Sequence, residues 1–153
     1  MKEINIIGFG LMDRQISTLF YLLGYEIGVY NKSKLNIYEF EKQIKLLQRK
    51  IDFSNFNAGK INIYQHIEDL KNSLTIESLN EDLNLKKEII QILRDNNNIV
   101  FSNSSSLGMD DLNCDFIHFF NTIYIKLIEL CGSNLERFTP LKDLKIRISY
   151  HLQ

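Results

Sequence analysis

Cysteine, proline and net charge are all scarce in this sequence of 153 residues. It holds two cysteines, Cys114 and Cys131, whose separation does not match the spacing of a metal site or a redox pair. We expect both to be reduced thiols buried on strands. A formal net charge of -1 gives no electrostatic reason to expect nucleic-acid binding.

Long apolar runs are also missing. No run is long enough to cross a bilayer, since Glu26 interrupts the best candidate. The N-terminus shows neither the basic region nor the cleavage site of a signal peptide, so we expect a cytoplasmic protein without a membrane segment. With 44% hydrophobic residues, one proline and no internal repeat or linker, the sequence predicts a single domain over residues 1–153.

The first thirty residues carry a strand–helix–strand pattern. An apolar run, Glu3–Ile7, stops at Gly8-Phe9-Gly10, and apolar residues then recur at helical spacing as far as Gly24. Glu26–Tyr30 follows as a second strand. A strand, a glycine turn, a helix and a parallel strand form the βαβ unit that binds a dinucleotide. The alternative is an ordinary strand-to-helix turn that happens to contain two glycines.

In the dinucleotide interpretation, the backbone supplies the chemistry. Gly8 permits the tight turn, and Gly10 lacks the Cβ that would keep a pyrophosphate away from the chain. The N–H groups at the helix start, around Leu11 and Met12, then face the phosphates together with the positive end of the helix.

Two positions depart from this fingerprint. Asp13 replaces the third glycine, which reduces close helix–strand packing and places a carboxylate near the pyrophosphate, where charge repulsion opposes binding. Asn31 replaces the acidic residue expected for the adenine ribose, and its amide accepts one hydrogen bond without the strength of a charged acceptor. These changes predict a nucleotide-binding fold with a weakened site.

Strands continue to alternate with helices along the rest of the chain. This alternation predicts an α/β fold with a doubly wound, mostly parallel sheet and helices on both faces. The expected elements are a helix with Ile37, Phe40, Ile44, Leu47 and Ile51 on one stripe; strands at 60–64 and 74–79; a helix from Glu81-Asp82 to Asp95; strands at 99–101, 116–120, 126–130 and 144–150; and a turn with a short helix at 132–142.

Four stretches in this order resemble the NAD-binding domain of the 3-hydroxyacyl-CoA dehydrogenases. They are IGFGLM, IESLNEDLNLKK, SNSSSL and HFFNTIYIKLIEL, where the family shows IGxGxMG, ExxxEdlxxK, SNTSSL and HFFNP followed by KLVE. Together they span residues 3 to about 131. The resemblance implies a Rossmann-like fold, NAD as cofactor, and a 3-hydroxyacyl-CoA or related 3-hydroxy acid as substrate.

The resemblance also assigns roles to individual residues. It makes His118 the base that removes the hydroxyl proton and Glu129 the carboxylate that orients the imidazole, and it places Ser105 and Asn121 at the substrate. Without the motif, His118 is more simply explained as a histidine satisfied at a strand end. The cofactor-binding positions are Gly8, Gly10, Leu11, Met12, Asn31, Glu81, Lys86 and Asn103.

The sequence also departs from this family. Thr122 replaces the proline of HFFNP, and one residue fewer separates His118 from Glu129. On two strands, a slip of one residue turns Glu129 to the opposite face, unless the intervening turn absorbs the deletion. The segment between Ser106 and His118 is shortened too, to about Gly108–Asn113.

The family continues into a helical domain that covers the substrate cleft, whereas this sequence ends at Gln153. We therefore expect the helical domain to be absent and the exposed apolar surface to pair with a second copy or a separate partner chain. Three functions remain open: an NAD-dependent dehydrogenase, a non-catalytic derivative acting as a binding or assembly module, and a protein that binds a different nucleotide or small ligand in the cleft. Lys32 beside Asn31 is the one hint of NADP.

Overall fold

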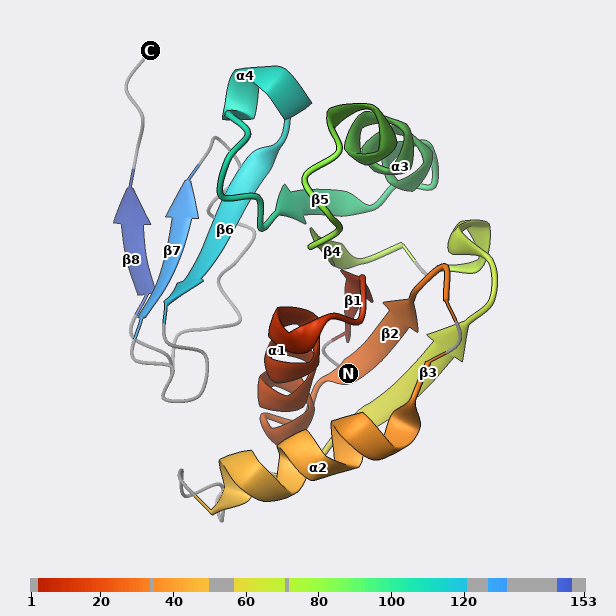
Figure 1. Ribbon diagram of the computed structural model, residues 1–153, viewed down its shortest axis with the longest axis vertical. Coiled ribbons are helices and arrows are strands. Elements are labelled where there is room, and N and C mark those ends of the chain that lie inside the picture. Colours follow the sequence, from red (N-terminus) through yellow and green to blue (C-terminus); the bar gives the residue numbers. More distant parts are fainter. Residues whose placement is uncertain are drawn as a thin grey trace.

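One sheet organises the part of the chain that the computed structural model describes, which is residues 3–33, 35–49, 57–70, 72–120, 127–131 and 146–149. Within these residues its eight strands lie in the order β3-β2-β1-β4-β5-β6-β7-β8 (Figure 1). The strands are β1 (Glu3–Ile7), β2 (Glu26–Tyr30), β3 (Lys60–Tyr64), β4 (Leu74–Glu77), β5 (Ile99–Ser102), β6 (Asp115–Phe120), β7 (Leu127–Cys131) and β8 (Ile146–Ser149).

The first six strands are all parallel. The chain builds outward from β1 through β2 to β3, then returns to the other side of β1 and builds outward through β4, β5 and β6. This is the doubly wound Rossmann order, and it confirms the predicted fold class. Beyond it, β7 runs antiparallel to β6, and β8 runs parallel to β7.

Helices lie on both faces of this sheet. Helix α1 (Leu11–Leu22) contacts α2 (Ile37–Gln48), whereas α3 (Leu83–Asp95) contacts α4 (Met109–Leu112) and the short 3₁₀ helix η1 (Ile67–Asp69). Parallel strands are joined by right-handed crossovers. Because the two halves of the sheet build in opposite directions, their helices are placed on opposite faces.

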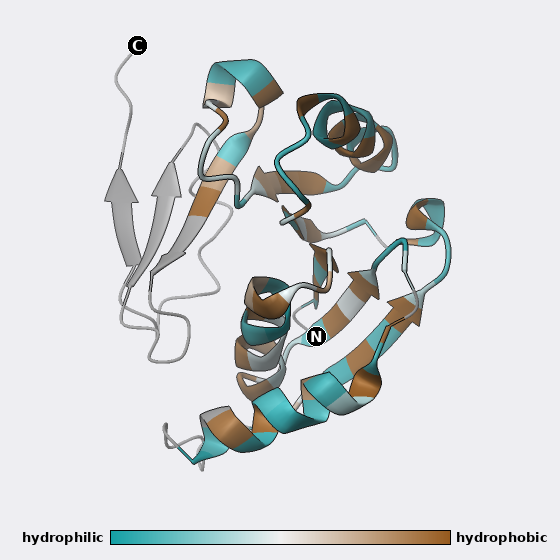
Figure 2. Ribbon diagram, in the orientation of Figure 1, coloured by the Kyte–Doolittle hydropathy of each residue, from teal (hydrophilic) through white to brown (hydrophobic). Residues whose placement is uncertain are grey.

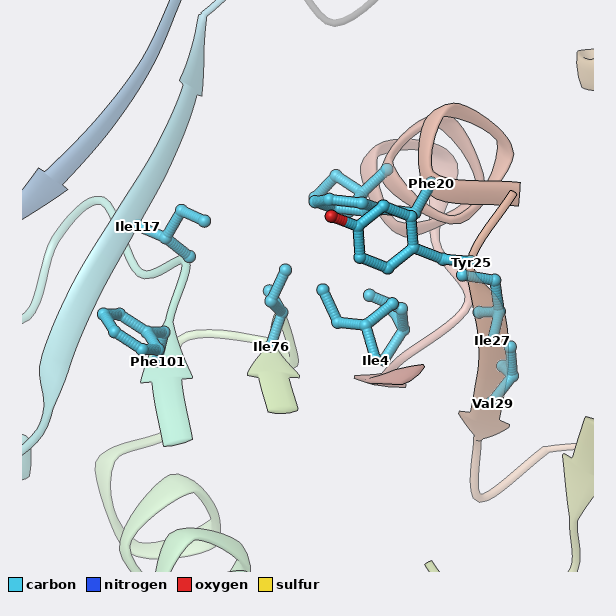
Figure 3. Packing of buried hydrophobic residues seen from close by; sticks show 10 residues of the cluster. Ile4, Phe20, Tyr25, Ile27, Val29, Ile76, Phe101 and Ile117 are labelled. Atoms are coloured by element: carbon cyan, nitrogen blue, oxygen red, sulfur yellow. The ribbon is translucent and has the colours of Figure 1, made fainter. Parts of the chain in front are cut away.

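The two-residue period of the strands separates two hydrophobic clusters. Ile6 and Phe101 belong to the cluster that includes Phe20 of α1, and the adjacent Ile7 and Val100 belong to the cluster with Leu93 of α3. In Figure 3, Phe20 reaches from α1 toward Tyr25, and the two rings meet edge to face with centroids 5.2 Å apart. Ile4, Ile76, Phe101 and Ile117 continue that cluster across the strands (Figure 3).

Helix α2 is amphipathic, and apolar and polar residues alternate along it in Figure 2. Phe40 is buried and Ile44 packs against α1, as predicted. Ile37 differs from the prediction because it is 44% exposed at the first position of the helix. The side chain of Leu47, and all of Ile51, lie outside the described residues.

Other sequence predictions differ in detail. The strand predicted at 74–79 ends at Glu77, although Ser78 N still donates a hydrogen bond to Ile7 O of β1. Cys114 precedes β6 rather than lying on it; it is a free, buried thiol, and burial raises its pKa to about 12. Cys131 is the last residue of β7.

The turn and short helix predicted at 132–142 lie outside the described residues. Among the described helices, none is long and apolar enough to cross a membrane.

A buried polar cluster holds the start of the central strands. Asn5 of β1 donates its amide to Thr75 Oγ1 (3.3 Å) and Asn98 Oδ1 (3.1 Å). On the other side of β1, Asn5 is the register partner of Gly28 in β2. A Cβ at Gly28 would lie 2.3 Å from Asn5 Oδ1, so the absence of a side chain there makes room for the asparagine.

We predict that Gly28→Ala lowers the free energy of unfolding by about 1–3 kcal/mol, the usual cost of overpacking a core, when measured by urea denaturation. In an Asn5→Ala background the same substitution should cost much less, because the conflicting amide is gone. An equal penalty in both backgrounds would contradict this explanation.

Candidate functional site

The site is built where the carboxyl ends of β1, β4 and β5 meet. Ser78 N donates to Ile7 O (3.0 Å), and Asn103 N donates to Glu77 O (2.7 Å), so the parallel ladder continues one residue beyond the strands. These bonds bring the segments after the three strands side by side. The strand order reverses between β1 and β4, and ligands of such sheets bind in the crevice at this point.

The turn between β1 and α1 depends on Gly8. Its φ of 121° is a conformation that side-chain-bearing residues rarely adopt. A Cβ there would lie 2.7 Å from Asp13 Oδ2 and 3.1 Å from the carbonyl oxygen of Ser78. The first N–H groups of a helix have no acceptor within the helix. Leu11 and Met12, which begin α1, are 59% and 39% exposed, so this helix end is open to a ligand.

Asp13 lies at this helix end and is only 2% exposed. Its Oδ2 accepts a hydrogen bond from Gly10 N at 2.8 Å, and its Oδ1 has no hydrogen-bond partner among the described residues. Burial raises the pKa of Asp13, and the charge of Glu77 adds to that rise. The Ser78 side chain, the Gly10 amide and the charge of Lys86 act in the opposite direction but are outweighed. The residue in place of the third glycine therefore closes the turn from inside.

A buried ion pair lies behind this turn. Lys86 Nζ is 2.7 Å from Glu77 Oε1, and both side chains are fully buried. Lys86 also donates to Leu79 O (2.9 Å), while Glu77 accepts from Leu79 N (2.6 Å) and, through Oε2, from Ser102 Oγ (2.7 Å). The pair thus ties β4, β5 and α3 together. That Lys86 lines the cofactor site stays a prediction, and its ammonium group already has two acceptors, Glu77 Oε1 and Leu79 O.

Glu81 holds the serine-rich segment that follows β5. It accepts hydrogen bonds from Ser104 Oγ and from Ser105 N (3.0 Å). Desolvation raises the pKa of Glu81, but these hydrogen bonds outweigh it, so that the pKa lies below its usual value. Ser105 itself is exposed, and Asn103 donates its amide to Ser78 Oγ at 3.3 Å. Ser105, Glu81 and Asn103 therefore gather at one end of the sheet.

The strand register brings His118 and Glu129 together. They are Cα partners in the antiparallel pair of β6 and β7. Directly opposed positions of such a pair belong to the same face of a sheet, so the register keeps these two positions opposite each other although one residue is missing between them. Phe116 pairs with Ser102, the last residue of β5, and His118 lies two residues further along β6. Asn121 lies outside the described residues, and the catalytic roles stay predictions.

Asn31 and Gly8 lie at one end of neighbouring strands. Gly8 N donates to Tyr30 O at 2.9 Å, and Asn31 follows Tyr30 directly. The amide nitrogen of Asn31 donates to Ser33 O (3.0 Å), which points to its carbonyl oxygen as the atom that accepts from a ligand.

Sequence comparison identifies the domain. The family model for the 3-hydroxyacyl-CoA dehydrogenase NAD-binding domain matches residues 3–136. The chain belongs to this family. The cofactor of this dehydrogenase domain is NAD, and the open glycine turn fits its pyrophosphate, whereas an ionised Asp13 opposes it. No curated protein is similar enough in sequence to match.

Solved structures share the fold of this dehydrogenase domain. The dehydrogenase part of multifunctional enzyme 1 from C. elegans is 23% identical, with a TM-score of 0.73 over 97% of this chain and 41% of that one. (S)-3-Hydroxybutyryl-CoA dehydrogenase from Ralstonia eutropha is 20% identical, with a TM-score of 0.74 over 99% of this chain and 64% of that one. 3-Hydroxybutyryl-CoA dehydrogenase from Escherichia coli is 18% identical, with a TM-score of 0.73 over 97% of this chain and 38% of that one. The chain thus spans less than two thirds of each structure.

Several residues of the site were missed at the level of sequence. Glu77 is the first glutamate of the paired-glutamate segment, but the sequence alone assigns no role to it. Ser78 and Ser102 are predicted only as part of a strand or of a family motif. The available signal was position, since all three lie at the carboxyl ends of adjacent strands. Their partners, Lys86 and Asp13, are not recognisable as buried from the sequence alone.

We predict that Lys86→Met lowers the free energy of unfolding by about 3–5 kcal/mol, because it leaves the buried Glu77 carboxylate without its counter-ion. Adding Glu77→Gln should recover part of this loss in chemical denaturation. The matched control is Lys87→Met, which alters an exposed neighbour and should change stability by less than about 0.5 kcal/mol. A similar loss for both lysines would contradict the buried pair.

A second prediction concerns Asp13 and pH. Its pKa is raised above the ordinary 3.8, so its contribution to stability is full at low pH and is lost as the pH rises through the folded-state value. Asp13→Asn removes this titration. The stability of wild type relative to Asp13→Asn should therefore fall between pH 4 and pH 7 in thermal unfolding, and a constant difference would contradict it.

Proposed function

We propose that this domain transfers hydride between NAD(H) and a 3-hydroxyacyl-CoA or a related 3-hydroxy acid. The observation that carries the proposal is the register of β6 and β7, in which His118 and Glu129 are Cα partners. A histidine oriented by a carboxylate is suited to take a hydroxyl proton near neutral pH. Membership of the dehydrogenase family supplies the cofactor, NAD.

In the oxidation direction, His118 accepts the proton of the 3-hydroxyl group, and Glu129 stabilises the imidazolium that forms. NAD, when bound, would supply the hydride acceptor for C3, and the product would be the 3-keto compound. Ser105 is exposed and has its backbone fixed by Glu81, so its hydroxyl is free to turn toward the substrate. Asn121 is the second proposed substrate contact.

The cofactor occupies the crevice at the ends of β1, β4 and β5. Gly8, Gly10, Leu11 and Met12 supply the glycine turn and the helix start for the pyrophosphate. Asn31 accepts from a ribose hydroxyl. Glu81, Lys86 and Asn103 complete the proposed set: Glu81 and Asn103 position the neighbouring segments, and Lys86 fixes the carboxylate behind the turn.

The remainder of the substrate site is proposed to come from elsewhere. The chain spans 41% of the C. elegans structure and 64% of the Ralstonia one. A cleft that excludes water needs walls on more than one side. We therefore propose that the domain works in the cytoplasm as a homo-oligomer or with a partner chain that covers the acyl-CoA.

A second candidate is a non-catalytic member of the family that serves as a binding or assembly module. The buried Asp13 favours it, because an ionised carboxylate at the helix end opposes a pyrophosphate. This candidate retains the fold and the His118–Glu129 register without turnover.

The deciding experiment is the oxidation of NADH with acetoacetyl-CoA as substrate. We expect turnover by the wild type, and His118→Ala should lower kcat by about 10²–10⁴-fold, since it removes the acid–base group but not the cofactor site. The matched control, His66→Ala, changes an exposed histidine next to η1 and should leave kcat unaltered. No turnover by the wild type would favour the non-catalytic candidate, whereas equal activity of His118→Ala would contradict the proposed role of His118 as the base.

A further inference from the structure

The short loop that follows β2 is polar and open to solvent. Asn31 comes directly after the strand, and its amide nitrogen donates to Ser33 O at 3.0 Å, which turns the loop back on itself. Lys32 and Ser33 are exposed, and Asn31 is half-buried. No acidic residue occurs between Tyr30 and Ile37. A ligand that approaches the end of β2 therefore meets exposed polar and basic groups.

This loop lies beside the glycine turn. Gly8 N donates to Tyr30 O at 2.9 Å, so the first residue of the turn and the last residue of β2 are joined directly. In a βαβ unit that binds a dinucleotide, the residue at the end of the second strand meets the 2′-hydroxyl of the adenine ribose. Residues 31–33 are therefore placed where the proposed cofactor presents its 2′ oxygen.

Arg14 adds a second cation near this position. Its guanidinium carbon is 5.9 Å from the centre of the Phe9 ring, and Phe9 meets Phe40 of α2 with ring centroids 6.5 Å apart. Because Phe9 directly follows Gly8 and reaches α2, the guanidinium lies on the side of the glycine turn that faces α2. Arg14 is only half-buried, yet its Nε is buried and has no hydrogen-bond partner among the described residues.

The charges at this position suit a phosphate better than a hydroxyl group. A carboxylate at the end of the second strand accepts from the 2′-hydroxyl of NAD, whereas a cation nearby accommodates the 2′-phosphate of NADP. Asn31 carries no charge that would repel this phosphate, and its carbonyl oxygen can accept from the 3′-hydroxyl. Lys32 and Arg14 are charged donors, and Lys32 carries its ammonium group on a flexible four-carbon stem.

We propose that Arg14, Lys32 and Ser33 form a subsite for the 2′-phosphate of NADP(H), so that this domain binds NADP(H) as well as NAD(H), and binds NADP(H) more tightly. The inference rests on the proposed cofactor site and is independent of hydride transfer. Contacts to the 2′-phosphate also offset the repulsion between Asp13 and the pyrophosphate, which both cofactors share.

The test compares two pairs of ligands whose members differ by the 2′-phosphate: NADPH with NADH, and 2′,5′-ADP with 5′-AMP. Their dissociation constants are measured by calorimetry on the purified protein. We expect the phosphorylated member of each pair to bind about tenfold or more tightly, because its added charge makes charge-assisted hydrogen bonds. This preference should shrink as salt is added, since ions screen exposed charges.

Three variants examine the subsite residue by residue. Lys32→Gln and Arg14→Gln each remove one cation and should each weaken NADPH about tenfold, with a change of less than about twofold for NADH. Asn31→Asp should reverse the preference, because its carboxylate repels the 2′-phosphate and accepts from the 2′-hydroxyl. Lys45→Gln, at an exposed lysine in the last turn of α2, is the matched control and should leave both affinities unaltered. Thermal unfolding reports whether each variant is folded.

Equal affinity for the two members of each pair would overturn the proposal, and so would a loss of NADH binding as large as that of NADPH in Lys32→Gln. Binding of none of the four ligands would overturn it together with the proposed cofactor site. Turnover of acetoacetyl-CoA with NADH, but no preference for NADPH, would overturn this inference alone. A preference for NADPH that Lys32→Gln abolishes, in a protein without turnover, would support the inference and contradict only the proposed catalysis.

Discussion

The ion pair between Glu77 and Lys86 is the constraint on which the rest of the site depends. A fully buried charge is tolerated only when it is paired and hydrogen-bonded. Here the pair is completed by Ser102 and by the backbone of Leu79, so it joins two strands to the helix that follows. The segments after β4 and β5 take their positions from this junction. The residues on those segments that are proposed to contact cofactor and substrate are therefore positioned by this network of charged and polar groups.

Asp13 is a second buried carboxyl group of the site, and its charge is less well compensated than that of Glu77. Its carboxyl group is also buried, but Lys86 is paired with Glu77, and the charge of Lys86 is outweighed by the effect of burial on the pKa of Asp13. Gly10 N donates a hydrogen bond to Oδ2 of this carboxyl group, and the buried Oδ1 has no hydrogen-bond partner among the described residues. What looks in the sequence like the loss of a glycine is, in three dimensions, a buried acid that fills the space beneath a glycine turn.

Sequence reasoning was strong where a periodic pattern carried the information. The apolar runs predicted β1, β2 and β5, and the helical spacing predicted α1 and α3, because burial on a sheet or helix face imposes those periods. It failed where three-dimensional context decides. Lysine is rarely buried, so nothing in the local sequence marks Lys86 as a core residue. The partner of Lys86, Glu77, lies nine positions away along the chain, so the ion pair depends on how β4 and α3 pack. The number of residues between His118 and Glu129 does not determine the register of their strands, so the sequence alone could not show that the two are paired.

The antiparallel pairing of β6 and β7 has a consequence for how this family diversifies. Because the two strands are fixed by their ladder, the geometry between His118 and Glu129 is set across the sheet and not along the chain. Residues can then be lost between them without separating the pair, provided that the same positions still meet. A search that demands a fixed interval between the two would pass over proteins that keep the arrangement intact. The pairing of β6 and β7, and not the length of the connection between them, therefore determines that positions 118 and 129 lie opposite each other.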